Sequence, residues 1–211
     1  MSYFIKEVYY SIQGEGYYTG RPAVFCRFSG CNLWSGLEKD RETAVCKFCD
    51  TDFIGSDGPG GGIFNNAEEL ADYISQIWPQ NSNLSPFCVC TGGEPLLQLD
   101  QPLVDALHSK HIEIAIETNG TRMPPDKIDW ICVSPKIGAK LILTSGNELK
   151  LIHPQSSQNP EQYINLDFKY FFLQPMDGPN LKKNTKQAME YCRAHPLWRL
   201  SLQTHKFLGI P

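Results

Sequence analysis

Three cysteines stand after a short apolar run at a spacing that suits a metal or cluster site. Cys31, Cys46 and Cys49 follow the pattern C-x14-C-x2-C. Structural zinc usually takes four protein ligands, whereas a cubic 4Fe–4S cluster held by only three thiolates keeps one iron open for a substrate or cofactor. Cys26 could supply a fourth zinc ligand, although it lies inside an apolar strand pattern. The spacing alone leaves the cluster and the zinc site as alternatives.

A second candidate segment, residues 91–95, reads Thr-Gly-Gly-Glu-Pro and follows another apolar run. Its two glycines lack a Cβ and let a ligand approach the backbone, and Glu94 offers a carboxylate that suits an amino group. Gly-Gly by itself more often marks an ordinary turn from strand to helix. The position of this pair at a strand end, downstream of three cysteines, favours ligand binding.

The elements that must position these residues alternate along the chain. Predicted strands cover residues 23–28, 86–90, 112–116, 130–133, 149–152 and 170–173, and predicted helices cover residues 66–78, 100–108 and 180–194. Alternation of this kind predicts an α/β fold with a parallel sheet, whose carboxyl edge carries the active site. Because helices are fewer than strands, we expect a partial parallel (β/α) barrel of about six strands. Alternating apolar residues within 1–20 predict an added N-terminal strand or hairpin.

Composition limits the possible classes of function. The chain has 211 residues, of which 41% are hydrophobic, so it can bury a core and is expected to form one domain. A net charge of -4 argues against nucleic acid as a partner, and no apolar run is long enough to suggest a membrane partner. Eight cysteines without a secretory signal predict a reducing, cytoplasmic location. Cysteines outside the trio are expected to pack in the core: Cys88, Cys90, Cys132 and Cys192.

Several motifs in a fixed order carry a family resemblance. They are residues 11–16, 27–33, 46–51, 91–95, 117–121, 134–136, 174–177 and 203–206. Together they resemble the 7-carboxy-7-deazaguanine synthase family of radical S-adenosylmethionine (SAM) enzymes over nearly the whole chain. The resemblance implies a partial barrel of the radical SAM type in a single domain, residues 1–211, with residues 1–20 as an N-terminal extension. The wider superfamily commonly spaces its cysteines C-x3-C-x2-C, so residues 32–45 are an insertion, and their charge predicts a surface excursion.

The resemblance implies a lyase reaction in the queuosine (7-deazapurine) pathway of tRNA modification. The family converts 6-carboxy-5,6,7,8-tetrahydropterin to 7-carboxy-7-deazaguanine with loss of ammonia. Its cofactors are one 4Fe–4S cluster, SAM, which is regenerated, and Mg²⁺. The cluster and SAM carry the chemistry, so no side chain is expected to act as a catalytic acid or base. The protein orients its ligands and excludes water.

Side-chain chemistry and the resemblance together assign site residues. The cluster ligands are Cys31, Cys46 and Cys49. The SAM site comprises Gly92, Gly93, Glu94, Glu117, Ser134, Lys136 and Gln174. The substrate site comprises Ile12, Gln13, Gly14, Glu15, Arg27, Thr91, His205 and the carboxylate of Pro211. Thr51 is the candidate Mg²⁺ ligand, because Mg²⁺ prefers oxygen and needs few protein groups.

Two other functions remain alternatives at this point. A glycyl-radical activating enzyme would keep the fold and act on a partner protein, whereas a zinc-stabilised module would not be an enzyme. The motif at residues 11–16 favours a small-molecule site. The expected partners are the pterin substrate, an external electron donor such as a flavodoxin, and a second copy of the chain, because a small partial barrel leaves apolar edges.

Overall fold

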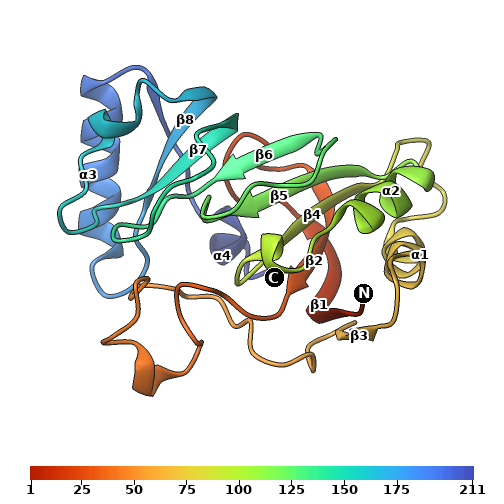
Figure 1. The fold of residues 1–211 in the computed structure, drawn as a ribbon. Coiled ribbons are helices and arrows are strands. Elements are labelled where there is room, and N and C mark those ends of the chain that lie inside the picture. Colours follow the sequence, from red (N-terminus) through yellow and green to blue (C-terminus); the bar gives the residue numbers. More distant parts are fainter.

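Apolar runs along the chain form one nine-stranded sheet in the computed structural model, which describes residues 1–211 (Figure 1). The strand order is β3-β1-β2-β4-β5-β6-β7-β8-β9. The strands are β1 (Tyr3–Ile12), β2 (Pro22–Phe28), β3 (Gly62–Phe64), β4 (Phe87–Gly92), β5 (Glu113–Thr118), β6 (Trp130–Val133), β7 (Ser145–His153), β8 (Asp167–Pro175) and β9 (Trp198–Leu200).

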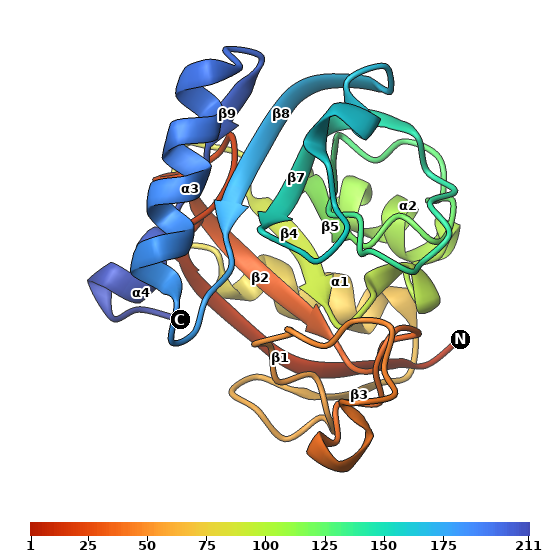
Figure 2. The same cartoon turned by 90° about the vertical axis from the view of Figure 1, so that its left-hand side faces the viewer.

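The sheet is parallel from β2 to β9, and apart from β3, which lies at the other edge, these strands follow one another in chain order. Successive connections therefore step in one direction, which curves the sheet as in a barrel. Its edges β3 and β9 do not pair, so the barrel stays open, as Figure 2 shows. The expected partial barrel is confirmed. It has one more parallel strand than expected, because β9 spans only three residues and gives no periodic signal.

The N-terminal segment forms β1, which pairs antiparallel with β2. Tyr3, Ile5 and Val8 are buried, and the register shift between Ile5 and Glu7 keeps Val8 on the face of the other two. Tyr10 is exposed and packs edge-on against Trp78. The loop after β1 lies across the amino-terminal end of the barrel. Its Tyr17 stacks on Trp130, the first residue of β6, and on Tyr170 in β8. This loop therefore closes the amino-terminal end of the barrel.

Four α-helices accompany the sheet: α1 (Ala67–Ile77), α2 (Gln101–Ser109), α3 (Leu181–Ala194) and α4 (Thr204–Leu208). Asn66 and Asp100 cap α1 and α2, since their side chains accept from the backbone N–H groups three residues on. Asn180 stands at the N-cap position of α3, but its side chain makes no such bond. Helices α1 and α2 lie together outside the sheet, and α3 packs on β8 (Figures 1 and 2). No helix is both long and apolar enough to cross a membrane.

Two buried apolar clusters hold the layers together. The larger lies between the N-terminal half of the sheet and helices α1 and α2, and the smaller joins β7 and β8 to α3. Cys26, Cys88 and Cys90 are fully buried in the larger cluster, and Cys132 is buried as well. Cys192 is only half-buried, at the edge of the smaller cluster. The core thus takes Cys26 out of reach of a surface metal site.

Candidate active site

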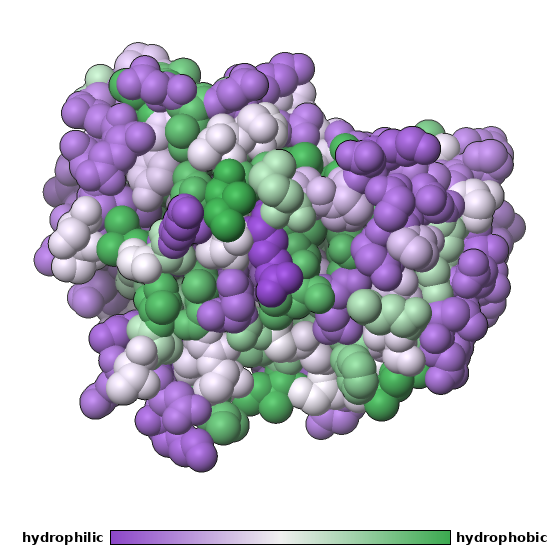
Figure 3. All heavy atoms as spheres, viewed as in Figure 1, coloured by the Kyte–Doolittle hydropathy of each residue, from purple (hydrophilic) through white to green (hydrophobic).

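A cavity of about 380 Å³ lies in the curve of the sheet and opens at the carboxyl ends of the strands. Its size suits a small-molecule site. Hydrophobic side chains gather around the middle of the face shown in Figure 3, within a mostly hydrophilic rim. All the site residues assigned from the sequence line this cavity except Glu94.

The three motif cysteines line one end of the cavity as free thiols. Cys31 follows the end of β2, and the chain closes on itself there, because the backbone N–H groups of Val45 and Cys46 both donate to the carbonyl of Leu33. Burial raises the pKa of the Cys31 and Cys46 thiols, and nearby Lys136 partly opposes this for Cys46. Without a bound group, these cysteines would therefore stay protonated at neutral pH.

The three thiols form a donor set that suits a 4Fe–4S cluster better than a single metal ion. No three His, Cys, Asp or Glu side chains converge closely enough to hold a single metal ion. A cubic cluster has a less compact ligand set, because each cysteine binds a different iron. Cys26 does not complete a four-cysteine zinc site, since it is fully buried in the core, where it lies beside Cys90 in the register of β2 and β4. Three thiols facing one cavity are the donor set that a 4Fe–4S cluster with one open iron requires.

The end of β4 packs tightly against the end of β2. Gly92 has a φ of 129°, and a Cβ there would lie 2.2 Å from the carbonyl oxygen of Phe28. Only glycine tolerates this conformation and this contact. The glycine therefore brings the β4 end against the segment that leads to Cys31, in addition to leaving the backbone open to a ligand.

Glu94, which is expected to contact the SAM amino group, is the one assigned residue that does not line the cavity. It is fully buried and lies off the cavity wall. Its carboxylate accepts from the N–H of Leu96, the hydroxyl of Thr118 and the N–H of Asn119. These bonds join the ends of β4 and β5. Glu94 therefore shapes the wall of the cavity from behind.

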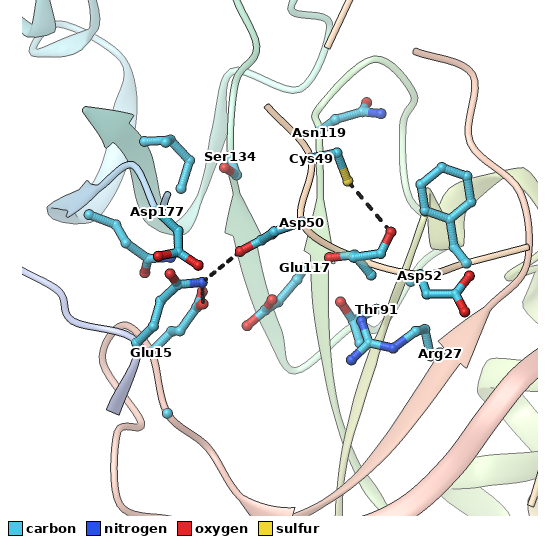
Figure 4. A pocket seen from close by; sticks show the side chains of 18 of the residues that line it. Glu15, Arg27, Cys49, Asp50, Asp52, Thr91, Glu117, Asn119, Ser134 and Asp177 are labelled. Atoms are coloured by element: carbon cyan, nitrogen blue, oxygen red, sulfur yellow. Dashed lines mark hydrogen bonds between the residues drawn. The ribbon is translucent and has the colours of Figure 1, made fainter. Parts of the chain in front are cut away.

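The ends of β6 and β8 supply polar groups to the far wall. Lys136 donates to the backbone carbonyl and the hydroxyl of Ser134, at 2.5 and 2.7 Å. Burial lowers the pKa of Lys136, and the neighbouring Cys46 and Cys49 oppose this shift. Gln174 is buried and accepts from the hydroxyl of Ser201 at 2.9 Å. Figure 4 shows Ser134 and Cys49 on the same side of the cavity.

Arg27 and Thr91 lie side by side on β2 and β4, where they are register partners (Figure 4). The Nε of Arg27 donates to Glu7 at 2.7 Å, and Nη2 donates to the hydroxyl of Tyr9 at 3.0 Å. Nη1 has no protein partner. The guanidinium is thus held in place by two bonds and presents its remaining donors to the cavity, where an anion can accept them.

A buried lysine that the motifs did not identify holds two carboxylates of the site. Lys150 on β7 is 4% exposed, and its Nζ lies 2.5 Å from Glu15 Oε2 and 3.4 Å from Glu117 Oε1. Gln13 donates to Glu117 at 3.1 Å, and Gln203 donates to Glu15 at 3.0 Å. Burial alone would raise the pKa of Glu15, but Lys150 and Gln203 lower it to about 2. In the sequence, Lys150 could have been identified as a lysine within the predicted apolar strand 149–152.

The C-terminal segment folds back over the cavity. Helix α4 docks on the loop after β1, because the N–H and hydroxyl of Thr204 both donate to the carbonyl of Gly14 at 3.0 Å. A Cβ at Gly14 would lie 2.2 Å from Nδ1 of His205, so this approach requires glycine. The hydroxyl of Ser11 donates to the terminal Pro211 at 3.1 Å. His205 and the chain end are thereby brought to the cavity.

Comparisons with known proteins agree with this arrangement. Residues 43–209 match the Radical SAM superfamily. The chain is 59% identical to the 7-carboxy-7-deazaguanine synthase of Burkholderia multivorans and 56% identical to that of Caulobacter vibrioides, with full coverage of both partners in each pair. It is 41% identical to the enzyme of that name in Bacteroides thetaiotaomicron, over 98% of this chain and 97% of that one. The crystal structure of QueE from Escherichia coli aligns with a TM-score of 0.73 at 28% identity, covering 96% of this chain and 94% of that one.

A partial barrel with three cysteines at its carboxyl edge is the architecture of a radical SAM enzyme, which uses a 4Fe–4S cluster and SAM. Identity over the full chain then narrows the assignment. The chain belongs to the 7-carboxy-7-deazaguanine synthase family.

Proposed function

We propose that this enzyme converts 6-carboxy-5,6,7,8-tetrahydropterin to 7-carboxy-7-deazaguanine with loss of ammonia. The observation that carries the proposal is a single cavity with three thiols at one end and a fixed arginine, two carboxylates and the chain terminus elsewhere on its wall. A substrate with both a carboxylate and a donor-rich pterin edge matches those groups.

Cys31, Cys46 and Cys49 would hold the cluster. When bound, the cluster supplies the electron that cleaves SAM. Around it the chain acts by orientation. Gly92 and Gly93 leave the backbone at the β4 end accessible to the SAM amino group. The SAM ribose and carboxylate would contact Glu117, Ser134, Lys136 and Gln174, which line the same cavity. Glu94 does not line the cavity, but its bonds fix the ends of β4 and β5, on which these contacts depend.

The substrate would bind across the cavity with its carboxylate on Arg27, whose Nη1 is free, and with Thr91 beside it. Carboxylates suit the two N–H donors of the pterin's amino-amidine edge, and Glu15 and the terminal carboxylate of Pro211 are placed to accept them. The remaining substrate contacts are the backbone of Ile12 and Gly14, the amide of Gln13 and the imidazole of His205. The stacking of Tyr17 on Trp130 and Tyr170 closes the amino-terminal end of the barrel and limits the entry of water there.

Further elements of the proposal concern groups beyond this chain. Thr51 would provide a hydroxyl ligand to Mg²⁺ beside the cluster loop, and an external donor such as a flavodoxin would reduce the cluster. Residues 1–211 act as one radical SAM domain in the cytoplasm, where the eight free cysteines stay reduced. A homodimer is supported by exposed apolar side chains, among them Phe207 and Leu208.

Anaerobic purification tests the proposal. The protein should be brown, contain about four irons per chain as a 4Fe–4S cluster requires, and convert the pterin to 7-carboxy-7-deazaguanine with release of ammonia. Substituting Cys31, Cys46 or Cys49 singly by Ala should abolish iron binding and SAM cleavage, while Cys26→Ser should keep both. A colourless protein with one zinc would contradict the proposal, as would a cluster-loaded protein that cleaves SAM but leaves the pterin unchanged.

A further inference from the structure

The charged insertion at residues 32–45 is mostly exposed, as a surface excursion should be, and it is also folded onto the cysteine loop. Its base is closed by the two bonds from Val45 and Cys46 to the Leu33 carbonyl. Within it, a short 3₁₀ helix spans Glu38–Asp40, and the hydroxyl of Ser35 donates to Asp40 at 2.6 Å. This segment, the orange loop below the sheet in Figure 1, is therefore a small folded unit attached to the cluster ligands.

Arg41 makes the contacts that connect this unit to the C-x2-C turn. Its Nη1 donates to the backbone carbonyls of Lys47 and Cys49, both at 3.1 Å. Its guanidinium lies 3.9 Å over the ring of Trp34, and its Nε donates to Glu38 at 2.7 Å. One side chain thus spans the insertion, the turn between two cysteines and an aromatic ring.

The ring beneath Arg41 is itself fixed. Trp34 is only 7% exposed, packs edge-on against buried Phe53 and donates from its indole nitrogen to the Leu37 carbonyl at 3.2 Å. The Arg41 side chain is 26% exposed, whereas its partner Glu38 is 76% exposed. The Arg41 charge is therefore less screened by solvent than that of Glu38, and it lies at the side of the turn.

We propose that Arg41 is a positioning residue for the iron–sulfur cluster. It fixes the turn that places Cys46 and Cys49, and it keeps a permanent positive charge next to these two ligands. The inference rests on the proposed function only in that these cysteines hold the cluster. Groups outside the ligand set commonly control how firmly a metal centre is held, and its reduction potential depends on nearby charge.

The two parts of this role can be separated by substitution. Arg41→Lys keeps the charge but cannot donate to two carbonyls while lying flat on the ring, because an ammonium has no planar fork. Arg41→Met removes both the charge and the fork. Lys39→Met is the matched control, since it removes an exposed positive charge two residues away that has no bond to the cysteine turn.

The experiment uses anaerobically reconstituted enzyme with a full cluster. Iron loss to a chelator is followed by the decay of visible absorbance, and the cluster potential is measured by spectroelectrochemical titration. We expect Arg41→Lys and Arg41→Met to lose iron about tenfold faster than the parent enzyme. The potential should become more negative in Arg41→Met only, because a nearby cation favours the reduced state. Lys39→Met should match the parent in both measurements.

The outcomes separate this inference from the proposed function. A parent protein that binds no cluster would contradict the function itself. A parent with a stable cluster, and Arg41→Met losing iron at the same rate, would overturn the positioning role. An equal effect in Lys39→Met would also overturn it, since the effect would then reflect the general charge of the insertion. Circular dichroism of the apo variants, expected to match that of the parent, shows that the rest of the fold is intact.

Discussion

Replacing Lys150 by Met should destabilise the enzyme through Glu15. The lysine is almost completely buried, and its Nζ is the only cation hydrogen-bonded to the Glu15 and Glu117 carboxylates. Met has a similar length and fills the space without the charge. The variant therefore keeps the packing of β7 but leaves two acidic groups without their cation. Removing one partner of a buried ion pair typically costs about 3–5 kcal/mol.

The magnitude can also be worked from Glu15 itself, whose side chain is 15% exposed. Its pKa is lowered from 4.5 to about 2 in the folded state. One pKa unit corresponds to about 1.4 kcal/mol, so this pairing contributes about 3 kcal/mol at neutral pH. For a urea m-value of about 2 kcal/mol/M, the unfolding midpoint should fall by about 1.5 M.

The stability of the parent and that of the variant should depend on pH with opposite signs and in different pH ranges. In the parent, a lowered folded-state pKa means that the Glu15 contribution is full above pH 4.5 and is lost as the pH falls towards 2. In Lys150→Met, burial dominates and raises the pKa of Glu15 above its usual value. The variant should then lose stability as the pH rises from about 5 to 7, where the Glu15 contribution in the parent is constant.

Urea unfolding of the apo protein at pH 5 and pH 7 measures both effects. Lys169→Met is the control, because Lys169 is an exposed lysine on the adjacent strand β8. The double variant Lys150→Met/Glu15→Gln should regain part of the lost stability, since the orphaned charge is gone. The reasoning is refuted if Lys150→Met unfolds at the parent midpoint, or if the double variant is less stable than the single one.

Two further predictions concern substrate binding. Arg27→Ala should weaken pterin binding more than SAM binding, by about 1.5–3 kcal/mol for a lost charge-assisted bond; calorimetric titration of each ligand checks this, with Arg21→Ala, whose ion pair with Glu113 lies away from the cavity, as the control. Equal losses for both ligands would contradict the proposed role. Removing residues 209–211, or adding a tag after Pro211, should lower pterin turnover while iron content and SAM binding persist. Full turnover by the extended protein would exclude a role for the terminal carboxylate.

Local sequence signals predicted the elements that carry them. Helices α1 and α2 each begin one residue after the predicted start, where a cap side chain accepts from the N–H group three residues on. Strand β6 was predicted with its observed bounds, because its apolar run ends at polar residues. The short elements β3, β9 and α4 were missed, since three to five residues give no period. Their existence depends on partners far along the chain, such as the carbonyl of Gly14 for α4.

The site shows the same division between local and distant signals. The cysteine spacing and the polar residues at strand ends were sufficient to predict residues that, except for Glu94, line one cavity. The burial of Glu94 could not be predicted because its motif is local, whereas its bonds to Thr118 and Asn119 come from the next strand. Lys150 was missed because its carboxylate partners Glu15 and Glu117 lie far from it in the sequence. Only the tertiary fold reveals which buried charges meet.

The chain terminus and the cluster loop are also joined directly, which bears on how the site excludes water. Lys206 on α4 lies 2.6 Å from Asp50, the residue after Cys49, and it also pairs with Asp177 after β8. The helix that brings His205 to the cavity is thus tied to both the cluster loop and the far wall. Radical chemistry requires a dry and fixed arrangement of ligands. These ion pairs are partly exposed and individually weak, so the closure they provide depends on the docking of α4 onto Gly14 as a unit.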